Sequence, residues 1–494
     1  MDDKYLISID QSTQGTKALL FNSEGTLLFR TDLPHRQMVN EFGWVSHDAN
    51  EIYENTLRVV RNLVELSKVE KENIVAIGIS NQRETTVLWD KISGQPLADA
   101  IVWQCARAAQ ICERDDIKGK ADVIRQRTGL LLSPYFPAAK ISWLLENGGL
   151  SAEKINKCEI CHGTVDSWLV YKLTGGKSYK TDYSNASRTQ LFNIVDLKWD
   201  EEICEWFGVN PKNMPEVVDS DAYFGETTFN GLFEKPIPIH SVMGDSHAAL
   251  FGQACLKPGM MKATYGTGSS IMMNIGKTPI FSRSGIVTSL AWSRNGVIEY
   301  VLEGNLNYTG AVITWLKDCM KMITSPAETA ILAKQAREDG SYLIPAFTGL
   351  GAPYWDSEAR AAVVGMSRMT GRKEVVRAGL ESIAYQIADV VGVIEKEAGI
   401  EIGELRVDGG PTRNDYLMQF QSDILDTGIL VPEAEELSGI GVAYMAGIVT
   451  GVWNDSIFDK LSRIWYTPKM KDEKRYIKMK GWENAVNRVL NEER

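Results

Sequence analysis

The stretch Leu6-Ile-Ser-Ile-Asp-Gln-Ser-Thr-Gln-Gly-Thr-Lys-Ala-Leu-Leu-Phe21 decides our prediction of the fold. An apolar run ends at Asp10, small and polar residues follow, and a second apolar run begins at Ala18. This pattern predicts two strands joined by a turn, with a carboxylate at the end of the first strand. The turn contains Gly15, and its N–H groups and hydroxyls can bind a phosphate while the carboxylate binds Mg²⁺. A solvated β-hairpin with an unrelated aspartate explains this stretch, taken alone, equally well.

A similar unit occurs near the middle of the chain. A strand-like run over residues 236–243 ends in Gly244-Asp245, and a helix is predicted over 246–254. The segment 261–273 then supplies another turn of small residues that opens into an apolar run. Because the pattern occurs twice, we predict an α/β fold of two similar domains with a cleft between them. The predicted domains are residues 1–250 and 251–494.

Other segments predict regular elements around these turns. A buried strand is predicted over 74–79, and a strand over 405–408 leads into a glycine turn at Gly410. Helices are predicted from apolar residues near a 3.6-residue period, over 44–66, 375–397 and 415–425. Glycines between a strand and a helix leave room for a ligand close to the backbone, so the turn at Gly410 is a candidate binding site. A plain loop also explains this turn.

Composition excludes several classes of protein. The chain of 494 residues is 44% hydrophobic and 24% charged, which is typical of a globular protein with two or more domains. A net charge of −11 argues against a nucleic-acid-binding surface. We see no signal peptide, and no apolar run approaches the ~18–20 residues of a membrane span. The seven cysteines are scattered, so we expect a cytoplasmic protein without membrane insertion.

The two aspartates and the small-residue turns contain the parts that phosphoryl transfer needs. These are a metal site, hydrogen-bond donors around the phosphates, and a base for the attacking hydroxyl. In this interpretation Asp10 binds magnesium, and Asp245 accepts the proton of the hydroxyl, a role that typically contributes ~10²–10⁴-fold. The residues expected to face the β- and γ-phosphates are Thr13, Gln14, Gly15 and Lys17.

Matches to known motifs run through almost the whole chain in collinear order. They are Asp10-Gln-Ser-Thr13, Gly43-Trp-Val45, Asn81-Gln-Arg-Glu-Thr-Thr86, Ile101-Val-Trp-Gln-Cys105, Pro134-Tyr135, Gly163-Thr-Val-Asp166, Asn185-Ala-Ser-Arg188, Gly244-Asp245, Thr264-Tyr-Gly-Thr-Gly268, Ala346-Phe-Thr-Gly-Leu-Gly-Ala-Pro-Tyr-Trp-Asp356, Arg406-Val-Asp-Gly-Gly410 and Leu417-Met-Gln-Phe-Gln-Ser-Asp423. On these motifs the chain resembles the FGGY carbohydrate kinase family, and within it the glycerol kinases most of all.

The resemblance implies a fold of the actin/hexokinase/Hsp70 (ribonuclease H-like) type that closes over ATP, Mg and a small polyol or sugar. In glycerol kinases an Arg–Glu pair, here Arg83 and Glu84, binds adjacent hydroxyls, and the aspartate at the position of Asp245 is the base. The other residues on the acceptor side would be Trp103, Tyr135, Ser246 and Ser270. The ATP side would comprise Thr13, Gln14, Gly15, Lys17, Thr267, Gly268, Gly310, Thr314, Gly410, Pro411 and Asn414. The first domain would hold the acceptor pocket and the first phosphate turn, and the second domain the adenosine site and the second turn.

Two positions depart from the pattern of glycerol kinases. Ser246 stands where they typically have glutamine, and Ser270 where they typically have phenylalanine. Small hydroxyls at the expected pocket wall predict a wider and more polar pocket. We therefore predict an acceptor longer than glycerol, such as a four- or five-carbon polyol or a ketose, because a pocket built for more hydroxyls discriminates against a ligand that lacks them. The alternative is glycerol itself, with neighbouring side chains filling the space.

Two other functions fit the same scaffold. A binding module gated by nucleotide would not need the base Asp245, and a phosphohydrolase would release phosphate without an acceptor. We favour the kinase because both Asp10 and Asp245 are present together with the polar Arg83/Glu84 pocket. The expected partners are ATP and a small polyol or sugar, with no nucleic acid. We also expect a homo-oligomer, a dimer or a tetramer.

Overall fold

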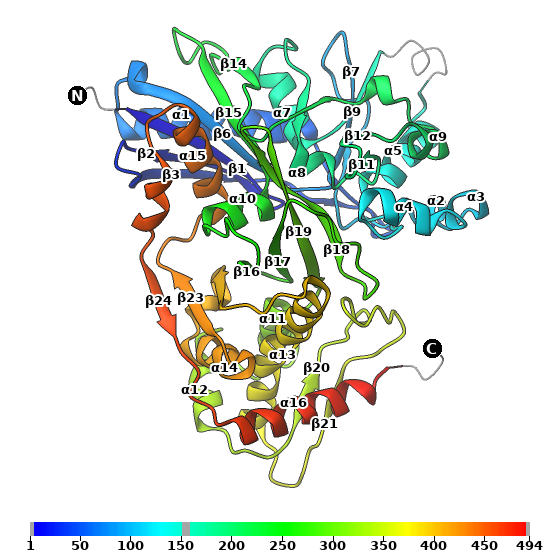
Figure 1. The fold of residues 1–494 in the computed structure, drawn as a ribbon, viewed down its shortest axis with the longest axis vertical. Helices are drawn as coiled ribbons and strands as arrows, with labels where there is room; N and C mark the ends of the chain where they lie inside the picture. Colours follow the sequence, from blue (N-terminus) through cyan, green and yellow to red (C-terminus); the bar gives the residue numbers. More distant parts are fainter. Residues whose placement is uncertain (1–3, 151–158, 491–494) are drawn as a thin grey trace.

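The computed structural model describes residues 4–150 and 159–490, which form two halves that each contain a central sheet (Figure 1). The first sheet has the strand order β14 (Gly225–Thr227), β15 (Ile237–Gly244), β6 (Ile74–Asn81), β1 (Tyr5–Gln11), β2 (Gly15–Phe21) and β3 (Leu27–Pro34). The second sheet has the order β18 (Val287–Arg294), β19 (Val297–Leu306), β17 (Ser269–Gly276), β16 (Met261–Tyr265), β22 (Glu404–Asp408), β23 (Gly428–Pro432) and β24 (Arg463–Tyr466).

The two sheets repeat one topology. In the first sheet, β1 pairs antiparallel with β2 and parallel with β6. In the second sheet, β16 pairs antiparallel with β17 and parallel with β22 in the same way. The prediction of two similar α/β halves is therefore confirmed.

The register aligns polar residues at the same end of both sheets. Asp10 on β1 lies opposite Lys17 on β2. The equivalent position on β16 is Thr264, which lies opposite Ser270 on β17 and Asp408 on β22. Residues that lie opposite one another project to the same face of a sheet, so each half presents a short polar row where its strands end.

The long helices follow the predicted apolar periodicity, with one correction. The helices α13 (Arg372–Ala398) and α14 (Asp415–Leu425) contain the segments predicted as helical. The helix predicted over 44–66 begins only with α1 (Ala49–Ser67), because the Asp48 side chain caps it by accepting a hydrogen bond from the Asn50 N–H. The residues just before it form the strand β5 (Val45–His47).

The helix α15 (Leu437–Val449) comes from the second half of the chain but packs against the first sheet. It contacts β1, β6 and α10 (Asp245–Gly252), and in Figure 1 it lies beside the strands of the first half. Glycines permit this close approach, since a Cβ atom at Gly441 would lie 1.9 Å from the carbonyl oxygen of Ala248. The chain therefore connects the two halves through α15 as well as through the segment after α10.

The remaining elements surround the two sheets. A smaller sheet has the order β4 (Met38–Val39), β5, β8 (Ala100–Ile101), β7 (Thr86–Asp90) and β9 (Ile160–Thr164). Beside the first half lie α2 (Ala109–Cys112), α3 (Asp115–Lys118), α4 (Ala121–Thr128), α5 (Pro137–Asn147), α7 (Val165–Leu173), β10 (Lys180–Asp182), α8 (Tyr183–Ala186), β11 (Phe192–Asn193), β12 (Lys198–Trp199), α9 (Glu201–Trp206) and β13 (Glu216–Val218). Beside the second half lie α11 (Gly310–Asp318), α12 (Glu328–Gln335), β20 (Tyr342–Ile344), β21 (Ala362–Val364) and α16 (Asp472–Asn487).

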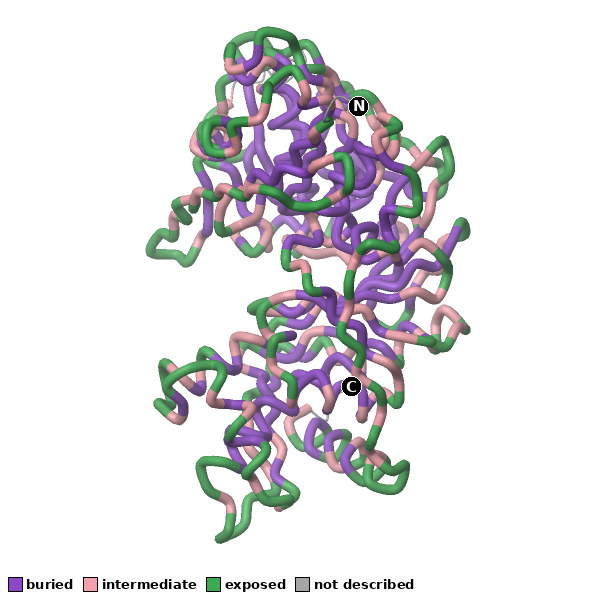
Figure 2. Tube along the Cα trace, turned by 90° about the vertical axis from the view of Figure 1, so that its left-hand side faces the viewer, coloured by how far each residue is buried: buried purple, intermediate pink, exposed green. Residues whose placement is uncertain are grey.

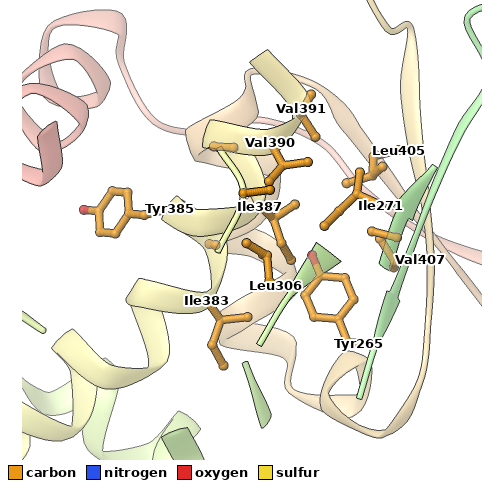
Figure 3. Close-up of a cluster of buried hydrophobic side chains, with 14 of the residues drawn as sticks. Tyr265, Ile271, Leu306, Ile383, Tyr385, Ile387, Val390, Val391, Leu405 and Val407 are labelled. Carbon is orange, nitrogen blue, oxygen red and sulfur yellow. The ribbon is translucent and has the colours of Figure 1, made fainter. Parts of the chain in front are cut away.

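Buried apolar residues fill the interior of both halves (Figure 2). In the second half, strand residues such as Ile271 and Leu306 pack against Ile383 and Ile387 of α13 (Figure 3). The described residues include no helix with the length and apolar character that a membrane span requires. The six cysteines at positions that the structure describes are free thiols.

Candidate active site

Asp10 lies near the end of β1 with its side chain almost buried. Its Oδ1 accepts a hydrogen bond from Ser80 Oγ at 2.9 Å, and its Oδ2 lies 3.8 Å from Lys17 Nζ. Burial raises the pKa of Asp10 to about 6, although Lys17 and Ser80 act in the opposite direction. The negative charge of Asp245 also raises this pKa, so the two predicted carboxylates are close enough to interact.

Hydrogen bonds and close backbone contacts hold the first turn, which joins β1 to β2, in place. The Ser12 N–H donates to the Gly15 carbonyl at 2.9 Å, and a Cβ atom at Gly15 would lie 2.4 Å from the Leu33 carbonyl oxygen. The Gln14 carbonyl accepts from the His35 N–H at 3.0 Å. Thr13 Oγ1 accepts a hydrogen bond from Trp103 Nε1 at 2.9 Å, which links the first turn to the predicted acceptor wall.

Lys17, the predicted phosphate cation, forms an ion pair with a residue distant in sequence. Its Nζ lies 2.6 Å from Glu436 Oε2, and Arg30 Nη1 lies 2.5 Å from Glu436 Oε1. Glu436 immediately precedes α15, so a residue of the second half of the chain neutralises the cation beside the first turn. Two residues further on, Ser438 Oγ donates to the backbone carbonyl of Asp245 at 3.0 Å.

Asp245 begins α10 beside a buried cluster of charges. Its Oδ1 accepts from the Ser246 N–H at 2.6 Å and lies 3.4 Å from Arg83 Nε. Arg83 donates from Nη1 and Nη2 to both oxygens of Glu303, at 3.0 and 2.7 Å. Burial raises the pKa of Asp245, and the guanidinium of Arg83 opposes this shift. The predicted acceptor residue Arg83 is therefore anchored by a carboxylate from the second half.

The same cluster contains a second arginine. Arg188 donates from Nε to Glu84 Oε1 at 2.5 Å, and its Nη1 lies 2.8 Å from Glu303 Oε2. Arg83, Glu84, Arg188 and Glu303 are each at most 5% exposed, whereas the Asp245 side chain is 34% exposed. Asp245 is therefore the member of the cluster that a ligand can reach most readily.

The acceptor side also contains the predicted aromatic wall and both serines. The rings of Trp103 and Tyr135 pack with their centroids 5.6 Å apart. Ser270 Oγ donates to Glu303 Oε1 at 3.2 Å, so this hydroxyl belongs to the hydrogen-bond network of the charged cluster. Ser246 is partly exposed on the first turn of α10.

The second turn is joined to the start of α11. The Gly266 N–H donates to the Gly268 carbonyl at 2.8 Å, and the Gly310 N–H donates to the Gly266 carbonyl at 3.0 Å. The Thr267 carbonyl accepts from the Thr309 N–H at 3.0 Å. A Cβ atom at Gly310 would lie 2.4 Å from the Gly266 carbonyl oxygen, so glycine is needed for this close approach.

A cavity of about 740 Å³ is lined by residues that were predicted to bind the adenosine part of ATP. Its predicted members are Gly310, Thr314, Gly410, Pro411 and Asn414. Apolar side chains such as Ile313, Leu380 and Ile383 complete the wall, which suits the flat ring of a purine. Another cavity, of about 630 Å³, is bordered by α12, α14 and α16 and contains none of the predicted site residues.

The donor set fits a magnesium ion that is held mainly by phosphates. Residues 4–150 and 159–490 contain no cluster of three or more His, Cys, Asp or Glu side chains arranged for a metal. Mg²⁺ is commonly held by one or two carboxylates together with phosphate oxygens and water. Asp10 can supply one carboxylate, since only its Oδ1 accepts the Ser80 hydrogen bond.

Several residues of the site were not predicted from the sequence. Glu303, Glu436 and Lys140 lie outside the recognised motifs, and Arg188 lies within a matching motif without an assigned role. Of these residues, Glu303 could have been found from the sequence, because it is an acidic residue inside the apolar run that forms β19. A buried charge in such a run requires a partner, and here the partners are two arginines.

The repeated sheets, the paired aspartates and the nucleotide-sized cavity define a two-domain α/β phosphotransferase. Comparison with known proteins gives the same result. The model of the FGGY family of carbohydrate kinases, N-terminal domain, matches residues 5–252, and the model of its C-terminal domain matches residues 261–449. The chain belongs to the FGGY family of carbohydrate kinases.

Similar proteins extend over the full length of the chain. Glycerol kinase 1 of Thermotoga maritima is 47% identical to this chain, and the match covers 99% of this chain and 100% of the relative. Glycerol kinase 2 of the same organism is 45% identical, and the match covers 99% of both chains. The crystal structure of Plasmodium falciparum glycerol kinase with ADP has a TM-score of 0.93 at 35% identity, covering 99% of each chain. A xylulose kinase from Lactobacillus acidophilus, at 20% identity and a TM-score of 0.87, shares the fold and covers 98% of this chain and 97% of its own.

Proposed function

We propose that this protein transfers the γ-phosphoryl group of ATP to a hydroxyl of glycerol. The observation that carries the proposal is the position of Asp245, which is the partly exposed carboxylate beside the Arg83–Glu84 pair and interacts with the charge of Asp10. The full-length relatives at 43–47% identity, which are named as glycerol kinases, support glycerol as the acceptor.

Asp245 is the base in this proposal. Its carboxylate takes the proton of the attacking hydroxyl, the hydroxyl oxygen forms a bond to the γ-phosphorus, and the bond to ADP breaks. The raised pKa of Asp245 favours this role, because a base with a higher pKa accepts a proton more readily. Arg83 and Glu84 bind adjacent hydroxyls, since a guanidinium donates and a carboxylate accepts hydrogen bonds.

The nucleotide is held by the remaining predicted residues. Its base and ribose occupy the cavity formed by Gly310, Thr314, Gly410, Pro411 and Asn414. Its phosphates extend toward the two turns, which contribute Thr13, Gln14, Gly15, Lys17, Thr267 and Gly268. A magnesium ion bound to Asp10 would neutralise phosphate charge. Trp103, whose ring packs against that of Tyr135, lies against the carbon chain of the acceptor, and Tyr135 adds a hydrogen bond to the acceptor.

The longer acceptor predicted from Ser246 and Ser270 is the second candidate. The hydroxyl of Ser270, which donates to Glu303, favours a polar wall. The relatives give this candidate no support and favour glycerol, its alternative. The predictions of a homo-oligomer and of a cytoplasmic location stay predictions.

An ADP-release assay of the purified protein tests the proposal. We expect ADP formation that depends on the acceptor, with a kcat/KM for glycerol above that for tetritols, pentitols and ketoses. A higher kcat/KM for one of these longer compounds would replace glycerol by the second candidate. Phosphate release without an acceptor would indicate a phosphohydrolase, and nucleotide binding without any turnover a binding module.

A further inference from the structure

Lys140 is a buried lysine at the back of the acceptor site. It belongs to the first turn of α5 and is 0% exposed. Its Nζ donates to the backbone carbonyls of Glu84 and Trp103, each at 3.3 Å, and to that of Tyr135. An ammonium group has three donors, so these three carbonyls use all of them.

The three carbonyls belong to the three segments that form the acceptor wall. Glu84 lies between β6 and β7, Trp103 follows β8, and Tyr135 precedes α5. One side chain therefore ties together segments that the sequence separates by 56, 37 and 5 residues from Lys140. A shift of the ammonium would move all three segments relative to one another.

Burial of this ammonium group is unfavourable unless its hydrogen bonds compensate for the water that it loses. Burying a charged amine costs free energy, and the positive end of the α5 dipole adds to that cost. Burial lowers the pKa of Lys140 to about 7, with Glu84 acting in the opposite direction. Glu84 also has a φ of 59°, in the left-handed region that a glutamate adopts only when its surroundings hold it there.

We propose that Lys140 is a positioning residue for the acceptor, which fixes the relative positions of Glu84, Trp103 and Tyr135 through their carbonyls. The inference rests on the proposed function, since it assigns these residues to the acceptor wall. Lys140 is not among the residues that line the nucleotide cavity, and its three hydrogen bonds all go to the acceptor wall. Its loss should therefore raise the KM for the acceptor more than that for ATP, whose side is linked to this wall by the hydrogen bond from Trp103 to Thr13.

The test compares Lys140→Met with the matched control Lys478→Met. Lys478 is another buried lysine, which lies 3.3 Å from Glu381 on the far side of the second half. We expect Lys140→Met to raise the acceptor KM by about tenfold or more, with the KM for ATP within about twofold of the wild type. We expect Lys478→Met to leave both KM values within about twofold. An unchanged acceptor KM in Lys140→Met, or equal changes in both KM values, would overturn the inference.

Amide hydrogen exchange gives a readout that does not depend on the identity of the acceptor. In Lys140→Met the amides around Glu84, Trp103 and Tyr135 should exchange faster, and those around Gly310 and Gly410 at the wild-type rate. Wild-type exchange at all of these sites would overturn the inference, even if glycerol proves not to be the substrate. Absence of wild-type turnover with glycerol would instead contradict the proposed function, and the KM comparison would then use the polyol that the enzyme accepts.

The pH dependence of the wild type covers the case in which Lys140→Met does not fold. The charged and ionisable groups around Lys140 are Glu84, Tyr135, Cys105, Cys112 and Arg107. A neutral amine has one donor fewer, so the acceptor KM should rise several-fold as the pH increases from about 6 to about 8.5. An acceptor KM that stays constant over this range would overturn the inference.

Discussion

Replacing Glu303 by glutamine should weaken both the fold and the acceptor site. The carboxylate of Glu303 accepts two hydrogen bonds from Arg83 and lies 2.8 Å from Arg188. A glutamine side chain keeps one oxygen and replaces the other by an NH₂ group. That group would face a guanidinium donor and could not pair with it. Arg83 would keep one of its two hydrogen bonds to this side chain, and both buried arginines would lose the negative charge of Glu303.

The cost follows from the contacts that remain. Removing one charge of a buried pair typically costs about 3–5 kcal/mol, because the other charge stays buried without compensation. Arg188 keeps Glu84 at 2.5 Å and Arg83 keeps Asp245 at 3.4 Å, so we expect the lower end of this range. For a domain of roughly 150–250 residues, each kcal/mol lowers Tm by about 2–4 °C. The expected decrease in Tm is therefore about 6–12 °C.

The acceptor site should change as well, because one terminal nitrogen of Arg83 loses its acceptor and becomes free to turn toward Asp245. A stronger pair with the base would reduce kcat/KM for the acceptor by roughly tenfold to a hundredfold. Differential scanning calorimetry and steady-state ADP release measure the two effects. The control is Glu299→Gln on the same strand, whose carboxylate accepts a hydrogen bond from the neutral amide of Asn274.

The control should keep its Tm and its kcat/KM close to the wild-type values. If Glu303→Gln shifts Tm no more than Glu299→Gln does, the buried charges contribute little to the junction of the two halves. If its kcat/KM also stays at the wild-type value, Glu303 does not orient Arg83. Both results together would refute the reasoning.

Two further changes test other parts of the site, and a third tests a buried histidine of β9. Asp245→Asn should lower acceptor-dependent turnover by about 10²–10⁴-fold and preserve ATP binding by calorimetry, so wild-type turnover would exclude this residue as the base. Glu436→Gln removes a negative charge beside the proposed phosphate site and frees Lys17 and Arg30. The KM for ATP should therefore fall about threefold to tenfold at low salt. A rise in this KM would indicate that Glu436 holds Lys17 in place for the nucleotide. Burial lowers the pKa of His162 to about 3, so the unfolded chain binds a proton below about pH 6.5 that the folded protein excludes, and stability falls toward acid. Between about pH 6.5 and pH 5 the free energy of unfolding should therefore fall by about 2 kcal/mol less in His162→Leu than in the wild type. Equal losses of stability in thermal unfolding scans would show that His162 is not the group that destabilises the protein toward acid.

The features predicted from sequence are those that depend on neighbouring residues. Asp10 lies near the end of β1 and Asp245 opens α10, as the apolar runs and small residues around them indicated. The roles of Glu303 and Glu436 depend on partners 220 and 419 residues away. No local pattern specifies such a pairing, because it arises only when the two sheets and α15 are packed together. The start of α1 was predicted five residues too early for a local reason: the apolar periodicity continues on the N-terminal side of Asp48, the residue that caps the helix.

The charged cluster lies where the two halves of the chain contact one another. On the side of β18 the halves are tied by the Thr288 N–H, which donates to the Gly129 carbonyl at 3.0 Å, and by the Leu290 N–H, which donates to Ser187 Oγ at 3.1 Å. The Arg83–Glu303 pair also joins the two halves, so a predicted acceptor residue of the first half is held by a carboxylate of the second. The proposed acceptor site is therefore built from side chains of both halves, and its geometry depends on how the two sheets pack together.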